Sequence, residues 1–201
     1  MTRLSLAALT LALLLGLSPA HGQSSNVAAD QVSFGRTVAV GADHVFVGAP
    51  QDVNTPGRVY VHAREDGAWT ERELLEAEDG TVRDGFGAAI ATEDDRLVVG
   101  APAANAVYVF RSSADGWTQA TRLTPADSTA GFGTSLALAG DRLFVGSETT
   151  VTTTDGDTTT GGAAHLFRQQ DDGAWSEASV LRSADAPADA GFARTLAASG
   201  K

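Results

Sequence analysis

Aspartates are the residues of this 201-residue chain whose chemistry is easiest to name, because carboxylate oxygens bind hard cations such as Ca²⁺. Four of them stand in two-residue gaps between apolar runs: Asp43, Asp94, Asp95 and Asp141. A calcium site must place six or more oxygens around one ion, which takes a loop of about nine residues. The gaps are too short for this, so we interpret the four aspartates as turn formers.

A second group of carboxylates lies in the Thr-rich insertion Glu148–Gly162, which contains Asp155-Gly156-Asp157. Two carboxylates and several hydroxyls could bind a hard cation weakly. A polar loop tip without a ligand is the interpretation that we favour. We therefore predict no cofactor, with Asp155 and Asp157 as the weak candidates for metal ligands.

Histidines are the other residues that could do chemistry. Two of them occupy positions that hold aromatic residues elsewhere in the repeats described below: His165 matches Tyr60 and Tyr108, and His62 matches Phe110 and Phe167. A third shares its position with two arginines, and all three are expected to be exposed: His44, Arg96 and Arg142. A Ser-His-Asp site would need tertiary contacts that the sequence does not indicate. We therefore predict no catalytic residues and no enzyme activity.

Several of these aspartates and histidines belong to a sequence motif that occurs three times. It runs over Phe34–Pro50, Phe86–Pro102 and Phe132–Gly146, always with a Phe and a closing Gly fourteen positions apart. A second motif follows each copy of the first and contains a Val-Tyr-Val-like run, an Asp-Gly pair and a tryptophan. All three tryptophans of the chain occupy this one repeat position. Such internal repetition indicates a repeat architecture.

Each repeat contains four short apolar or alternating runs bounded by turn residues, which is typical of strands and hairpins. In the second repeat they are Ala88–Thr92, Arg96–Gly100, Ala106–Arg111 and Trp117–Leu123. The first two are joined by Asp94-Asp95, which leaves room for only a two-residue hairpin. Four antiparallel strands in about 50 residues, repeated, predict the blades of a β-propeller, and therefore an all-β protein.

The repeats resemble the FG-GAP repeat, the blade of the integrin α-subunit propeller, and particularly its bacterial secreted relatives. The resemblance covers Phe34 to the C-terminus. The residues that carry it are Phe34, Gly35, Gly48, Ala49, Pro50, Phe86, Gly87, Gly100, Ala101, Pro102, Phe132, Gly133, Gly146, Trp69, Trp117 and Trp175. Two copies depart from the pattern, with Gly146-Ser147-Glu148 in place of Gly-Ala-Pro and Phe192-Ala193 in place of Phe-Gly.

The resemblance implies where ligands bind. Many FG-GAP blades hold Ca²⁺ in their first hairpin, but the two-residue hairpins here do not support a calcium site. Integrin propellers bind ligands on the face that carries the second and the blade-to-blade connections. In this chain the long connections of that face are Ala49–Gly57, Glu76–Gly85, Ser147–Gly162 and Ser183–Gly191.

The expected organisation is a set of blades that form an incomplete ring. It comprises a signal peptide (1–22), a lead-in (23–33), blade 1 (34–85), blade 2 (86–131), blade 3 (132–191) and the first strand of a truncated blade 4 (192–201). Because propellers of this family are typically seven-bladed, we favour a fragment of a longer chain. The alternatives are a ring built from several chains, or an open stack whose exposed edges self-associate.

Composition restricts the compartment and the partners. The signal peptide has Arg3, the apolar run Leu4–Leu17 and small residues at Ala20 and Gly22, which predicts export to the periplasm or the extracellular space. The formal net charge of −11 argues against a nucleic-acid or anionic-membrane surface. The apolar runs are too short to predict membrane insertion. The chain has no cysteine, so its stability must come from packing.

The function that we predict is a secreted, non-catalytic module for adhesion to, or recognition of, an extracellular protein or glycan. A rigid stack of sheets would display its loops with little ordering cost on binding. The alternatives are a carbohydrate-binding propeller and a propeller domain appended to an enzyme encoded beyond the C-terminus.

Overall fold

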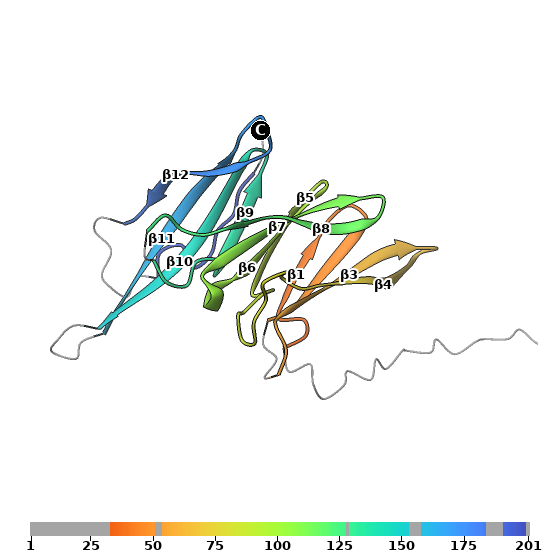
Figure 1. The fold of residues 1–201 in the computed structure, drawn as a ribbon, viewed down its shortest axis with the longest axis horizontal. Helices are drawn as coiled ribbons and strands as arrows, with labels where there is room; N and C mark the ends of the chain where they lie inside the picture. Colours follow the sequence, from red (N-terminus) through yellow and green to blue (C-terminus); the bar gives the residue numbers. More distant parts are fainter. Residues whose placement is uncertain (1–32, 51–53, 128, 153–157, 184–190, 200–201) are drawn as a thin grey trace, which may run out of the picture.

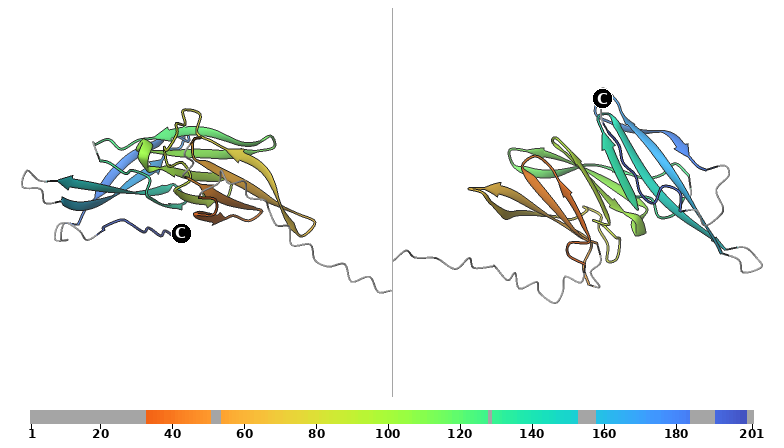
Figure 2. Two further views of the ribbon diagram at one scale, coloured as in Figure 1. Left: turned by 90° about the horizontal axis from the view of Figure 1, so that it is seen from below. Right: turned by 180° about the vertical axis from the view of Figure 1, so that it is seen from behind.

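The computed structural model describes residues 33–50, 54–127, 129–152, 158–183 and 191–199. Three antiparallel sheets stand side by side along the chain, each built from four consecutive strands (Figures 1 and 2). The only helical element of this part is a single 3₁₀ turn at Pro102–Ala104. The prediction of an all-β protein made of four-stranded blades is confirmed.

The first sheet, in the order of the chain, contains β1 (Thr37–Val40), β2 (His44–Ala49), β3 (Arg58–Glu65) and β4 (Ala68–Leu75). The second contains β5 (Ala89–Glu93), β6 (Arg96–Ala101), β7 (Ala106–Ser113) and β8 (Gly116–Leu123). The third contains β9 (Ser135–Ala139), β10 (Arg142–Thr152), β11 (Thr158–Gln169) and β12 (Trp175–Leu181). The strands predicted for the second repeat agree with β5–β8 to within two residues at every end.

The first hairpin of each sheet turns on two residues, as predicted. In the second sheet Glu93 pairs with Arg96, so that Asp94 and Asp95 form the whole turn. Asp94 has a φ of +52°, a left-handed conformation that aspartate tolerates better than most residues. Few residue types adopt this left-handed conformation easily, so an aspartate or glycine between two apolar runs indicates the position of the turn.

The outer hairpin of each sheet carries a bulge at the same place. The register shifts lie between Val61 and His62, between Val109 and Phe110, and between Leu166 and Phe167. A bulge bends its strand and increases the local twist. Its repetition shows that the three sheets share one geometry as well as one strand order.

The pairing also fixes which residues are equivalent. On the second strand of each sheet a valine faces the third strand's aromatic position: Val47 pairs with Tyr60, Val99 with Tyr108 and Val145 with His165. His165 therefore stands at the position of the two tyrosines, as predicted. His62 likewise stands at the position of Phe110, since Val45 and Leu97 are their partners.

Two apolar interfaces hold the sheets together. The first interface lies between sheets one and two, and its buried residues include Phe46, Val61, Leu75, Phe86, Leu97, Val99, Tyr108 and Trp117. The second interface lies between sheets two and three, and it includes Val98, Val107, Val109, Leu123, Phe132, Leu143, Val145 and Phe167. Strand β6 is buried along its whole length, because neighbours cover both faces of its sheet.

The insertion in the third repeat differs from the prediction. Ser147–Gly162 was expected to be a long loop, but β10 continues to Thr152 and β11 begins at Thr158, with Thr152 paired to Thr158. Threonine is β-branched and favours strands, so a Thr-rich insertion extends the hairpin instead of forming a loop. The extended hairpin projects from the body of the molecule (Figure 1).

Residues 192–199, where the sequence predicts the start of a fourth blade, form a turn followed by an irregular segment. The carbonyl of Ala193 accepts the Ser135 hydroxyl at 2.7 Å, as the carbonyl of Gly87 accepts that of Thr37 at the start of sheet two. Among the described residues, no helix combines the length and the apolar character that crossing a membrane would require.

Candidate functional site

The Phe-Gly and closing Gly residues of each repeat bond to one another. The backbone N–H of Gly87 donates to the carbonyl of Gly100 at 3.0 Å, and Gly133 donates to Gly146 at 2.9 Å. The first repeat has the same bond, from Gly35 to Gly48 at 3.0 Å. The fourteen-residue spacing therefore closes the first hairpin of each sheet at its base.

The closing glycine also contacts the Phe-Gly of the next repeat. A Cβ placed on Gly48 would overlap the carbonyl oxygen of Gly87, and one placed on Gly100 would overlap that of Gly133. In the first repeat the Thr37 hydroxyl donates to the carbonyl of Gly87 at 2.6 Å. A glycine inside a strand marks such a close backbone approach. The motif residues thus have a structural role at the interfaces between sheets.

The aromatic motif residues are buried where a preceding sheet covers them. Phe86 and Phe132 are fully buried, and Trp117 packs edge-to-face on Phe46 of the first sheet at 5.1 Å. Their counterparts in the first sheet, Phe34 and Trp69, are exposed. These positions therefore serve packing between sheets, and their burial depends on the neighbour and not on their own repeat.

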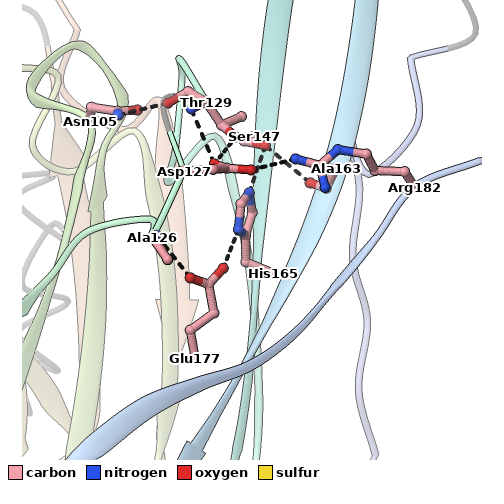
Figure 3. A network of polar contacts seen from close by, with 9 residues as sticks. All are labelled: Asn105, Ala126, Asp127, Thr129, Ser147, Ala163, His165, Glu177 and Arg182. Atoms are coloured by element: carbon pink, nitrogen blue, oxygen red, sulfur yellow. Dashed lines mark hydrogen bonds and ion pairs between the residues drawn. The ribbon is translucent and has the colours of Figure 1, made fainter.

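One polar network, at the second interface, brings a serine, a histidine and a carboxylate together (Figure 3). The Ser147 Oγ lies 3.1 Å from His165 Nε2, and His165 Nδ1 lies 2.6 Å from a carboxylate oxygen of Glu177. The sequence did not indicate that these three residues would come together. The three residues come from β10, β11 and β12, and only the strand pairing makes them neighbours.

The burial of these side chains determines whether the serine could act as a nucleophile. Ser147 is 1% exposed and His165 is fully buried, with its ring edge-to-face on Phe132 at 5.2 Å. A nucleophile must reach the substrate, and this hydroxyl lies beneath the surface. The second carboxylate oxygen of Glu177 accepts the backbone N–H of Ala126 at 2.8 Å. The arrangement therefore anchors the connection between sheets two and three.

The second sheet uses different residues for a similar anchor. The Tyr108 hydroxyl donates to Asp79, in the connection that precedes its sheet, at 2.8 Å. Burial is the main reason why the pKa of Tyr108 is raised above its usual range. His165 is shorter than tyrosine, so Glu177 bridges the remaining distance to the loop.

A branch of the network holds the same connection. Asp127 accepts hydrogen bonds from the backbone N–H and the hydroxyl of Thr129, and Arg182 lies 2.5 Å from its other oxygen. The Thr129 hydroxyl, followed by Arg182, holds the pKa of Asp127 below its usual range. Asn105 completes the network, because its side chain donates to Thr129 and accepts from the Phe132 N–H.

An open cleft lies at the other end of the sheets, between the first hairpins of sheets one and two. Its volume is about 250 Å³, and its lining includes Asp43, His44, Asp94, Ser112 and Trp117. The His44 ring stacks on Phe46 at 6.0 Å and meets Trp117 edge-on at 5.8 Å. The cleft therefore has an aromatic wall and carboxylates contributed by two hairpins.

The equivalent place in the second interface is filled by Arg96. Its guanidinium donates to the carbonyl of Gly140 at 2.5 Å, to the Glu93 carboxylate at 2.6 Å and to the Gln169 amide oxygen at 3.3 Å. Glu93 in turn accepts the Gly140 N–H at 2.9 Å. The counterparts of Arg96 and Glu93 in the first interface are His44 and Gly41, which do not reach across in this way.

The prediction of exposed side chains at this repeat position is therefore wrong. Arg96 is 8% exposed, and His44 and Arg142 are half-buried. The sequence showed a charged residue beside a turn, which usually faces solvent. It could not show the facing hairpin of the next sheet, whose turn carbonyl attracts the guanidinium.

The weak metal candidates, Asp155 and Asp157, lie outside the described residues. So do parts of two connections on the predicted binding face, 51–53 and 184–190. In the part of the chain that the structure describes, no three histidine or acidic side chains are grouped so that they could hold a metal ion.

Comparison with protein families identifies the class of these sheets. The model of the FG-GAP repeat matches residues 69–110 and 117–167, which span the last strand of sheet one, most of sheet two and much of sheet three. The chain is an FG-GAP repeat protein, and its three sheets are blades of an incomplete β-propeller. A comparison with curated proteins gave no match.

Proposed function

We propose that this protein is a secreted, non-catalytic recognition module for an extracellular protein or glycan. Its binding site in this proposal is the cleft at the first interface, which lies at the first hairpins and therefore on the face opposite to the one that the family resemblance predicts. The observation that supports this most directly is the difference between the two interfaces. One is filled by the protein's own Arg96, whereas the other leaves polar and aromatic side chains facing a cleft of about 250 Å³.

The rigidity of the surroundings favours recognition. The hairpins that form the cleft have two-residue turns, and the blades beneath them are joined by apolar interfaces and close glycine contacts. A pre-organised site loses little conformational entropy when a ligand binds. The predicted signal peptide, residues 1–22, would bring such a module to extracellular ligands.

The absence of enzyme activity is part of the proposal. The Ser147, His165 and Glu177 side chains have the order of a catalytic triad, but their burial leaves the serine without a path to a substrate. We therefore assign this network to the anchoring of the connection between blades two and three.

The test is to close the cleft by transplanting the residues of the second interface. The double variant Gly41→Glu, His44→Arg places a Glu and an Arg where the second interface has Glu93 and Arg96. There is room at Gly41, because a Cβ there would lie 3.7 Å or more from its neighbours. The matched control is Ala174→Arg, which adds an arginine at an exposed position in the hairpin between β11 and β12.

The wild type, the double variant and the control are compared on a peptide array and a glycan array. We expect ligands that bind the wild type and the control but not the double variant. Thermal unfolding checks that all three proteins are folded. Silence of the wild type on both arrays, or equal binding by the double variant, would contradict the proposal.

A further inference from the structure

We propose that the open face of sheet one docks a second copy of this chain, and that the two copies form a dimer about a twofold axis. The open face is the side of β1–β4 that points away from sheet two, at one end of the row of sheets (Figure 1). Its exposed apolar residues are Phe34, Val38, Val40, Trp69 and Leu74. The proposal is independent of the cleft, which lies on the side of sheet one that points towards sheet two.

Strand alternation places Val38 and Val40 on the open face. Their neighbours in β1 point towards sheet two: the Thr37 hydroxyl donates to the carbonyl of Gly87 at 2.6 Å, and Ala39 packs against the first apolar interface. Because successive side chains of a strand point to opposite faces, Val38 and Val40 point away from sheet two. They are 58% and 68% exposed.

The same reasoning applies to β4. Leu75 is buried in the first interface, so Leu74 beside it points to the open face, where it is exposed. Phe34 packs edge-to-face on Tyr60 of β3 at 5.1 Å. Strand pairing joins residues of all four strands into one row on this face: Val38, Val47, Tyr60 and Leu74. The open face is therefore apolar across the whole width of the sheet.

The other two sheets bury the residues at the same repeat positions. Phe34 corresponds to Phe86 and Phe132, which are fully buried against the preceding sheet. Trp69 corresponds to Trp117, which packs on sheet one. Sheet one thus has the apolar side chains of an interface, but in the part of the chain that the structure describes no sheet covers them. A contiguous apolar surface of this kind marks a protein–protein contact.

A head-to-tail arrangement would cover the open face with the far face of sheet three, the side of β9–β12 that points away from sheet two. That far face is already occupied. The Ser135 hydroxyl donates to the carbonyl of Ala193 at 2.7 Å, and a Cβ on Gly162 would overlap the carbonyl oxygen of Phe192. Residues 192 and 193 hold the place that an incoming Phe34 would need. The arrangement that leaves this contact intact is isologous, with the open face of one copy against the same face of the other.

The charged residues of the open face also suit a twofold. Arg64 pairs with Trp69 and Glu71 pairs with His62, so both charged side chains lie on this face, across β3 and β4. Among the described residues, neither side chain has a hydrogen-bond or ion-pair partner. An isologous contact presents the same surface twice, so each copy offers the other both a cation and an anion.

The experiment measures the mass of the purified protein by sedimentation equilibrium over a range of concentrations. We expect a reversible equilibrium between monomer and dimer that goes no further. The test variant is Val40→Lys, Leu74→Lys, which changes two side chains that are exposed in the monomer. We expect it to raise the dissociation constant of the dimer at least about hundredfold, because the interface would bury each lysine without a partner.

The matched control is Val82→Lys, Leu181→Lys, which makes the same two changes outside the open face. The exposure is similar, since Leu181 is 48% exposed and Leu74 is 42% exposed. Leu181 stands at the repeat position of Leu75 and Leu123, on the far face of sheet three, so the control also tests the head-to-tail arrangement. We expect it to dimerise like the wild type. Thermal unfolding checks that all three proteins are folded.

Three results would overturn the proposal: a monomer at every concentration, association beyond the dimer, or a test variant that dimerises as well as the control. A monomer whose ligands on the glycan array are lost in the test variant would assign the open face to a glycan and not to a second copy. These results are separable from failure of the recognition role, because that role is tested by closing the cleft on the other side of the sheet.

Discussion

The two interfaces between blades have the same apolar construction but differ at their hairpin ends. In both, a Phe-Gly of one repeat packs over the closing glycine of the repeat before it. At the second interface Arg96 and Glu93 bridge the hairpins, and at the first interface His44 and Gly41 leave a cleft. The comparison shows that the repeat preserves the contacts that stack the sheets, whereas residues beside the turns are free to diverge.

The largest expected effect tests the glycine contacts that the two interfaces have in common. Gly48→Ala and Gly100→Ala each place a Cβ on the backbone of the next repeat, so each should lower the free energy of unfolding by about 3 kcal/mol or more. Denaturant unfolding followed by tryptophan fluorescence measures this. Gly41→Ala is the control, because its Cβ has room and should change stability by less than about 1 kcal/mol. Similar stabilities for Gly100→Ala and Gly41→Ala would refute the close-contact explanation.

A smaller effect tests the difference between the interfaces. Arg96→Met keeps much of the aliphatic stem but leaves Glu93 and the Gly140 carbonyl without their partner, and it should cost about 2–3 kcal/mol. His44→Met should cost less than about 1 kcal/mol, because His44 contacts sheet two only through the edge-on packing of its ring on Trp117, which a methionine side chain can partly replace. The same unfolding measurement applies to both variants. Equal losses would mean that the two positions contribute alike, contrary to the structure.

The smallest effect tests the hydroxyl of Tyr108, which anchors a connection at the first interface, where the second interface has His165 in the same repeat position. Because the pKa of Tyr108 is raised above its usual 10.0, its contribution is complete below pH 10 and is lost as the pH rises through the folded-state pKa. One proton limits the slope to ~1.4 kcal/mol per pH unit. Alkaline unfolding curves should therefore fall less steeply for Tyr108→Phe than for the wild type. Parallel curves would remove Tyr108 as the cause.

Sequence reasoning succeeded wherever the information is local or repeated. The two-residue turns at Asp94-Asp95 leave no alternative to a tight hairpin, and the shared position of His165 and Tyr108 follows from aligning the repeats. Turn residues bound the apolar runs of the second repeat, so its strand boundaries could be placed closely.

It failed where a residue's surroundings come from a distant part of the chain. Arg96 is buried by a hairpin of the next sheet 44 residues away, at Gly140. His165 contacts both Ser147 and Glu177 only because three strands of its own sheet pair. The Thr-rich insertion failed for another reason. Its length suggested a loop, while its β-branched residues favoured the strands that it forms. A glycine at position 41, where the second repeat has Glu93, was the one signal for the cleft.

The contact between a closing glycine and the next Phe-Gly has a consequence for how the molecule folds. Gly48 belongs to the first repeat and Gly87 to the second, so a repeat cut out between residues 85 and 86 would lose the partner of its own glycine. The smallest cooperative unit is therefore a sheet together with the opening residues of its successor. Stability then grows with the number of neighbour contacts in a one-dimensional array, and adding a repeat adds both a sheet and a junction.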